Sequence, residues 1–171
     1  MNFSELSGNR FSVRRFSDRP VPREVLEDIL EAGRVAPTAH NNQPWRVRVL
    51  QSPGALAKAD AVTSCRYGAP VVLLFSYDEV LDWKNPLEEG VHAGVQDVSI
   101  VATHMMLAAW EKGVGSVWVN YFEPSKTEKE FGFSPTERAV LLLPLGYAAE
   151  GAAPAPAHTE KKALADLVEW L

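Results

Sequence analysis

The chain has 171 residues, of which 46% are hydrophobic and 23% charged, as expected of one globular domain with its own core. Its net charge of −5 at pH 7 and its pI near 5.4 argue against general binding to nucleic acids or anionic membranes. Cys65 is the only cysteine, which excludes an intrachain disulfide and a thiolate metal site.

The amino terminus and the hydropathy pattern indicate a soluble protein. Residues 1–6 lack the charged start and the apolar run of a signal peptide. No stretch reaches the roughly 18 uninterrupted apolar residues that a membrane-spanning helix requires. We therefore expect a cytoplasmic protein, with neither a membrane nor a nucleic acid among its partners.

The spacing of apolar residues in the first half of the chain predicts three helices and two strands. From Pro22 to about Gly33, apolar residues share one helical face, and proline suits the first turn of a helix. An uninterrupted apolar run after Pro70 has the pattern of a strand buried on both faces. The expected elements are helices at residues 2–8, 22–33 and 54–64, and strands at residues 45–49 and 71–75.

The second half is dominated by the longest predicted helix, from about Ala93 to Lys112, with Gly113 at the position that ends it. Apolar residues cover most of this helix, so we expect it to be buried, with a second subunit supplying part of the cover. Because strands and helices are interspersed, the fold class is α+β or α/β, with the strand order open. The remaining expectations are an irregular segment at 78–91, strands at 116–119 and 139–145, helices at 125–131 and 161–171, and an extended Ala/Pro segment at 148–158.

Two polar segments carry the functional signal. The first, Arg10-Phe11-Ser12-Val13-Arg14-Arg15, opens a stretch (10–23) with five arginines and one acidic residue. Arginine forks match phosphate oxygens, although solvated surface charge would explain the same cluster. The second, Asn41-Asn42-Gln43-Pro44-Trp45, packs amide donors and acceptors that suit the edge of a planar heterocycle. A phosphate site followed by a heterocycle-edge site indicates a bound mononucleotide.

Taken together, the motifs resemble the FMN-dependent nitroreductase family, and its short members most closely. The resemblance starts at Arg10-x-Ser12-x-Arg14 and Val21-Pro22, and continues at residues 36–45, which read Ala-Pro-Thr-Ala-His-Asn-Asn-Gln-Pro-Trp. It covers nearly the whole chain through Asp97, Met105-Met106-Leu107, Gly113-Val114-Gly115, residues 118–122, Leu145-Gly146-Tyr147 and residues 161–164.

This resemblance implies an α+β nitroreductase-like fold, with a mixed, mainly antiparallel sheet flanked by helices, in an obligate homodimer. Residues 1–171 would form a single FMN-binding domain, with 148–171 as an extended carboxyl-terminal arm that reaches around the partner. Two FMN sites would lie at the subunit interface, each built from both chains.

The same resemblance assigns roles to individual residues. Arg10, Ser12 and Arg14 would hold the ribityl phosphate and the N1/O2 side of the flavin. Asn41 would bond the ribityl or pyrimidine part, with Gln43 nearby. Asn120 and Tyr121 would lie near flavin N5, and Lys161 and Lys162 near the phosphate. Phe11 and Thr38 are also predicted to bind the cofactor. Many relatives have a polar or basic residue in place of Phe11 and a serine in place of Thr38.

The chemistry would take place on the cofactor, so no catalytic side chain is predicted. A cation beside N1 and O2 stabilises the negative charge of reduced flavin, and we expect Arg14 in that role. The chain has no G-x-G-x-x-G after a strand, hence no sign of a separate NAD(P)H site. This favours a ping-pong reaction in which NAD(P)H and a small nitroaromatic- or quinone-like acceptor take turns over one flavin face. The four histidines lack the spacing of metal ligands.

Two other interpretations stay open at the level of sequence. A flavin-binding protein without turnover, for FMN storage, sensing or delivery, would share every one of these motifs. A small binding domain without flavin would leave the arginines as ordinary surface charge.

Overall fold

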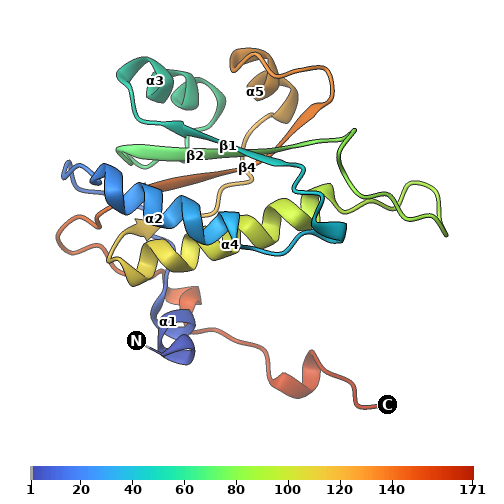
Figure 1. Cartoon of the computed structure of the whole chain (residues 1–171). Coiled ribbons are helices and arrows are strands. Elements are labelled where there is room, and N and C mark those ends of the chain that lie inside the picture. Colours follow the sequence, from blue (N-terminus) through green and yellow to red (C-terminus); the bar gives the residue numbers. More distant parts are fainter. Residues whose placement is uncertain (1) are drawn as a thin grey trace.

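The computed structural model describes residues 2–171 as a four-stranded sheet of order β1-β2-β4-β3, with antiparallel neighbours and helices on both faces (Figure 1). A parallel bridge joins Ser12 to Ser116 at the sheet edge, so the predicted α+β class with a mixed, mainly antiparallel sheet is confirmed. β3 is shorter than the predicted strand 116–119, and Val119 adds only an isolated bridge to Leu142. The strands are β1 (Trp45–Leu50), β2 (Val71–Asp78), β3 (Gly115–Ser116) and β4 (Glu137–Gly146), and the helices are α1 (Phe3–Asn9), α2 (Arg23–Arg34), α3 (Pro53–Val62), α4 (Gly94–Glu111) and α5 (Pro124–Glu130).

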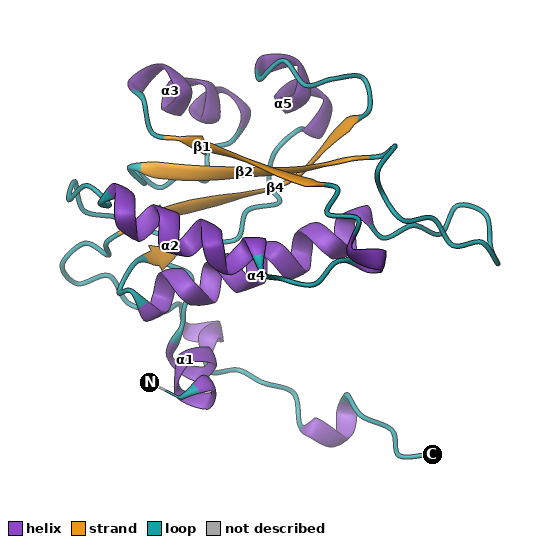
Figure 2. Cartoon of the chain, in the orientation of Figure 1, coloured by secondary structure: helices purple, strands orange, loops and turns teal. Residues whose placement is uncertain are grey.

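β2 lies at the centre of the core because its apolar run is buried on both faces. Successive side chains of a strand point to opposite faces of the sheet. Leu73 and Phe75 pack in the core that α2 and α4 cover, whereas Val72 and Leu74 pack in the core beneath α3. Figure 2 shows the sheet between these two helical layers. The prediction of a strand buried on both faces is confirmed.

α2 and α4 approach each other closely because a glycine permits it. A Cβ atom on Gly33 would lie 2.1 Å from Met105 Cε, so no larger residue fits there without movement. Ile29 is fully buried in the same core. α4 ends where the sequence predicts: Gly113 has a φ of +75°, a left-handed conformation that glycine adopts without strain.

α4 is only partly buried within one chain. Its inner face, which includes Val98, Val101 and Met105, belongs to the main core. On the outer face, Val95 keeps 50% and Ile100 39% of its surface exposed. The single chain therefore supplies only part of the expected burial, and the cover expected from a second subunit stays a prediction.

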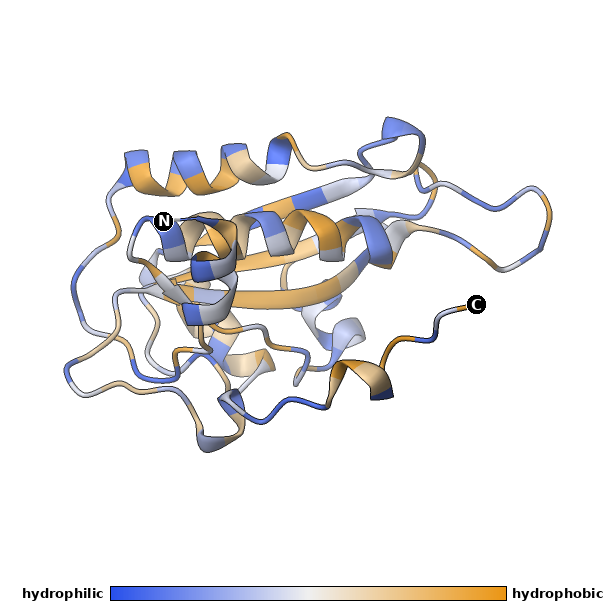
Figure 3. Cartoon of the chain, turned by 90° about the horizontal axis from the view of Figure 1, so that it is seen from below, coloured by the Kyte–Doolittle hydropathy of each residue, from blue (hydrophilic) through white to orange (hydrophobic). Residues whose placement is uncertain are grey.

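The carboxyl-terminal segment differs most from the prediction. Residues 161–171 do not form the expected helix, and only a three-residue 3-10 turn, Leu164–Asp166, occurs there. An isolated short helix is marginal unless its apolar face packs, and this segment leads away from the domain (Figures 1 and 3). Its apolar side chains are exposed, with Trp170 at 90%. Residues 148–158 lack regular structure as predicted, up to the 3-10 turn Pro156–His158.

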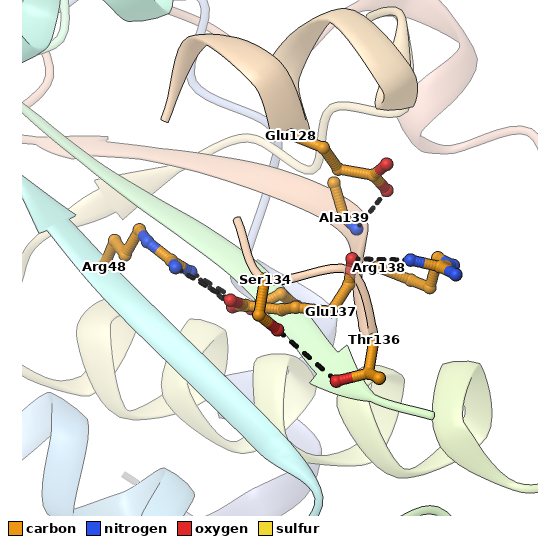
Figure 4. A network of polar contacts seen from close by, with 8 residues as sticks. Arg48, Glu128, Ser134, Thr136, Glu137, Arg138 and Ala139 are labelled. Atoms are coloured by element: carbon orange, nitrogen blue, oxygen red, sulfur yellow. Dashed lines mark hydrogen bonds and ion pairs between the residues drawn. The ribbon is translucent and has the colours of Figure 1, made fainter. Parts of the chain in front are cut away.

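A buried ion pair ties the three longer strands together (Figure 4). Glu137 accepts hydrogen bonds from Arg48 Nη1 at 2.5 Å and Nη2 at 2.9 Å, and from Ser76 Oγ at 2.5 Å. The Arg48 bonds hold the pKa of Glu137 below its ordinary value. The guanidinium of Arg48 also lies 3.9 Å above the ring of Phe133. This network joins β1 to β4 across β2 and contains no residue of either polar motif, so its role is structural.

Candidate functional site

The arginine motif lies on an extended segment beside β3. Val13 N donates to Ser116 O at 2.9 Å, which fixes the segment against the sheet edge. Side chains alternate along extended backbone, so Arg10, Ser12 and Arg14 lie on the side opposite the fully buried Val13. The local structure thus brings the three predicted phosphate-binding residues to one face.

A cavity of about 200 Å³ opens beside this face. Burial of Arg10 lowers its pKa, which shows that its guanidinium has lost hydration. Neither Arg10 nor Arg14 forms an ion pair with a carboxylate of residues 2–171. A partly buried guanidinium without a counter-ion is costly, so Arg10, together with the exposed Arg14, makes this face suited to an anionic ligand. The cavity is lined by Phe11, Ser12, Arg14, Ala155, Ala157 and His158.

Phe11 joins the arginine motif to α4 and to the carboxyl-terminal arm. Its ring centroid lies 5.2 Å from that of Trp110 and 6.3 Å from that of His158, both edge to face. Lys161 and Lys162 are exposed and do not line the cavity, although Lys161 Nζ donates to His158 O at 2.8 Å. In the single chain, the arm therefore reaches the arginine motif through His158.

Tyr67 lies beside Arg14 and was missed by the sequence analysis. The neighbouring Cys65 thiol raises the pKa of the Tyr67 hydroxyl, while Arg14 acts in the opposite direction. Tyr67 has a φ of +55° and is followed by Gly68 at +76°. A Tyr-Gly pair just before a buried strand was the available signal for this turn.

Asn120 and Tyr121 line a second cavity, of about 430 Å³. Thr63 Oγ1 donates to Tyr121 O at 2.7 Å and accepts from Cys65 N at 3.1 Å. Thr63 therefore ties the segment after β3 to the loop that carries Tyr67. Through this loop, the predicted ring-facing segment and the arginine motif belong to one end of the fold.

The amide motif forms a strained turn between α2 and β1. His40, Asn41 and Gln43 have φ values of +52°, +54° and +50°. Such backbone costs about 1–3 kcal/mol per residue and is concentrated at functional sites. Thr38 Oγ1 accepts from Gln43 N at 3.1 Å, and the His40 ring stacks on Trp83 at 5.9 Å. Thr38 thus shapes the turn, whereas the Asn41 side chain is exposed and available to a ligand.

Asp97 on α4 anchors this turn and was not among the predicted site residues. Its Oδ1 accepts from Ala39 N at 2.9 Å, and the residue is only 2% exposed. Its Oδ2 is buried without a hydrogen-bond partner in residues 2–171, and burial raises the pKa of the carboxyl. An acidic residue in the first turn of a largely apolar helix was the signal in the sequence.

The two motifs lie at opposite ends of α4. The arginine motif meets the helix at Trp110 through Phe11, and the amide motif meets it at Asp97 through Ala39. Asp97 and Trp110 are thirteen positions apart on α4, which is about 20 Å along the helix axis. One chain therefore does not bring the arginine motif and the amide motif into a single site.

A further cavity, of about 880 Å³, lies at the loop between β2 and α4. Asp82 holds this loop, accepting from Ala93 N at 3.1 Å and bonding His92 Nδ1 at 2.7 Å. Among residues 2–171, no cluster of His, Cys, Asp and Glu is arranged to hold a metal ion. None of the helices in this described part combines the length and the hydropathy needed to span a membrane.

Known proteins resemble this chain in sequence and in fold. The model of the nitroreductase family matches residues 8–67 and 65–147. A nitroreductase family protein from Clostridium difficile 630 is 35% identical, with a TM-score of 0.93 over 99% of this chain and 98% of that one. An NADH dehydrogenase from Thermus thermophilus is 30% identical across 82% of this chain and 84% of its own length. A variant of an FMN- and NADPH-dependent nitroreductase derived from Sphigopyxis sp. strain HMH shares the fold, at 22% identity and a TM-score of 0.81 over 99% of both chains.

Proposed function

The chain belongs to the nitroreductase family, and on this premise we propose that it is an FMN-dependent oxidoreductase that takes hydride from NAD(P)H. The observation that carries the cofactor assignment is the arginine face, where Arg10 and Arg14 have no carboxylate partner within residues 2–171 and Arg14 lines a cavity of about 200 Å³. A phosphate would supply the missing counter-charge, with Ser12 as a further donor. The residues of this face therefore fit FMN.

The separation of the two motifs supports an assembled site. A second copy of the chain would place Asn41 of the partner subunit near the arginine face, with Gln43 of the partner subunit beside it. The exposed apolar residues Val95 and Ile100 on α4 give such a dimer a surface to bury. We propose that the chain acts as one domain, with residues 148–171 as the arm, whose end beyond His158 packs on the partner.

In this site, the protein binds and orients while the flavin, when bound, supplies the hydride chemistry. Arg14 would provide positive charge at the N1 and O2 edge of the ring, where negative charge develops on reduction. Tyr67 would hold the Arg14 guanidinium in place. Asn120 and Tyr121 would present backbone groups to the ring near N5.

The acceptor is proposed to be small and electron-poor, such as a nitroaromatic or a quinone. The donor and the acceptor would use the same flavin face in turn, because the chain has no separate dinucleotide-binding motif. Solvent would supply the protons that the reduced acceptor takes up, so no acid–base side chain is required.

Titration of the purified protein with FMN tests the proposal. Arg14→Ala should raise the Kd for FMN roughly 10- to 100-fold, because a charge-assisted hydrogen bond to the phosphate or ring edge is lost. Arg23→Ala is the matched control, since Arg23 is an exposed arginine that pairs with Glu27 on α2. Equal Kd values for the two variants, or no uptake of FMN by the wild-type protein, would contradict the assignment.

A further inference from the structure

Residues 82–93, between β2 and α4, form a hairpin that is closed by its own contacts. Lys84 and His92 pair as an isolated antiparallel bridge near its base. The Asp82 side chain, which is 1% exposed, accepts from Ala93 N at 3.1 Å and bonds His92 Nδ1 at 2.7 Å. A buried carboxylate keeps such partners because losing them is costly. The Asp82 side chain therefore fixes both ends of the hairpin where they join the domain.

This hairpin contacts the amide turn, which comprises residues 38–43. The Trp83 ring stacks on the His40 ring, with centroids 5.9 Å apart and planes inclined by 24°. Close by, Asn42 Nδ2 donates to Leu81 O at 3.1 Å, just before the hairpin begins. An aromatic pair and a hydrogen bond at neighbouring positions hold one segment against another. The amide turn therefore rests on the hairpin as well as on α4.

The amide turn depends on such contacts because its backbone is strained. His40, Asn41 and Gln43 have φ near +50°, and residues other than glycine keep that conformation only where the surrounding structure holds it. Thr38 Oγ1 holds the end of the turn by accepting from Gln43 N at 3.1 Å. Trp83 packs on His40, the first of the strained residues. The stack therefore fixes the residue directly before Asn41, whose exposed side chain is available to a ligand.

We propose that Trp83 is a positioning residue of the flavin site, which holds the amide turn in its ligand-binding conformation through His40. A turn that is already fixed loses less conformational entropy when the flavin ring reaches Asn41. Asp82 supports Trp83 in this role, because it closes the hairpin directly beside it. This inference rests on the proposed function, and it adds to the flavin site a residue from outside both polar motifs.

Four variants separate the stack from other effects. Trp83→Leu removes the aromatic ring, and Trp83→Phe keeps one. His40→Asn removes the other ring of the pair, and asparagine tolerates the left-handed backbone at this position. Leu87→Ala is the matched control, since Leu87 lies on the same hairpin and is 92% exposed. Fluorescence titration of each full-length variant gives the Kd for FMN, and circular dichroism in the visible flavin bands reports on the surroundings of the bound ring.

Trp83→Leu should raise the Kd for FMN about 3- to 10-fold, the factor that corresponds to one aromatic pair, and should change the visible circular dichroism. Trp83→Phe should restore most of the affinity, and Leu87→Ala should bind like the wild type. His40→Asn should weaken binding by a similar factor to Trp83→Leu. The double variant should be no weaker than either single variant, because both changes remove the same contact.

A Trp83→Leu protein that binds FMN as tightly as the wild type would overturn the inference. A double variant whose loss is the product of the two single losses would also overturn it, because Trp83 would then act independently of His40. If Trp83→Leu does not fold, His40→Asn carries the test, and an unchanged Kd for that variant has the same meaning. Failure of the wild-type protein to bind FMN would instead overturn the proposed function.

Discussion

The most informative perturbation mixes two damaged forms of the chain. The arginine variant carries Arg10→Ala and Arg14→Ala. The amide variant carries Asn41→Gly and Gln43→Gly; glycine is chosen because both positions have φ near +50°, and glycine keeps that backbone without strain. Each variant alone should lose tight FMN binding, because each of its sites lacks one half of the contacts.

The expected number of tight FMN sites follows from the distance between the two motifs. They lie roughly 20 Å apart along α4, so the two motifs of any one chain belong to different sites. In a twofold-symmetric dimer, each site then takes its arginines from one protomer and its amides from the other. A heterodimer of the two variants has one site with both defects and one site with neither. It should therefore bind about one tight FMN per dimer, with wild-type affinity at that site.

Co-expression with two different affinity tags isolates the heterodimer, and titration with FMN gives the stoichiometry and the Kd. Both parent homodimers, purified in the same way, serve as controls. A heterodimer with no tight site would show that the arginine and amide motifs act within the same chain. Failure of the two tagged chains to co-purify would refute the dimer itself.

Three further predictions concern single elements. Glu137→Ala should cost about 2–3 kcal/mol in urea unfolding at pH 7, since it leaves Arg48 without its partner, while the exposed control Glu27→Ala should cost less than about 0.5 kcal/mol. Arg48 holds the pKa of Glu137 below its ordinary 4.5, so this stabilisation is complete above about pH 4.5 and is lost as the pH falls through the lowered pKa of the folded state. A difference in unfolding free energy between wild type and Glu137→Ala that does not change with pH would contradict the pairing. Burial raises the pKa of Asp97 above its ordinary 3.8, so the wild type should lose stability as the pH rises from 3.8 through the raised pKa of the folded state. Asp97→Asn should remove this pH dependence from the urea midpoints. Removal of residues 148–171 should abolish FMN retention, and an unchanged flavin content after gel filtration would count against the arm.

The regular elements could be predicted because their sequence patterns agree with their surroundings. The apolar run at 71–75 can bury all its side chains only as a strand between two helical layers. Gly113 ends α4 with a positive φ, which glycine adopts without strain. The arginine motif forms one face because its backbone is extended, and alternate residues of an extended segment share a side.

The remaining features depend on contacts that local pattern does not encode. Asp97, Tyr67 and His158 reach the two motifs from segments distant in sequence, and only tertiary packing brings them there. The helical spacing at 161–171 misled because an amphipathic segment forms a helix only where its apolar face has a surface to cover.

The central claim is that this chain binds FMN and that NAD(P)H reduces it there. Anaerobic stopped-flow mixing of the FMN-loaded protein with NADH and with NADPH tests it directly, through the visible absorbance of the flavin. The proposed function predicts that at least one of the two donors bleaches the bound flavin, and that a quinone added afterwards restores the colour. Bound FMN that neither donor bleaches would contradict it, and would indicate a protein that stores, senses or delivers the flavin without turnover.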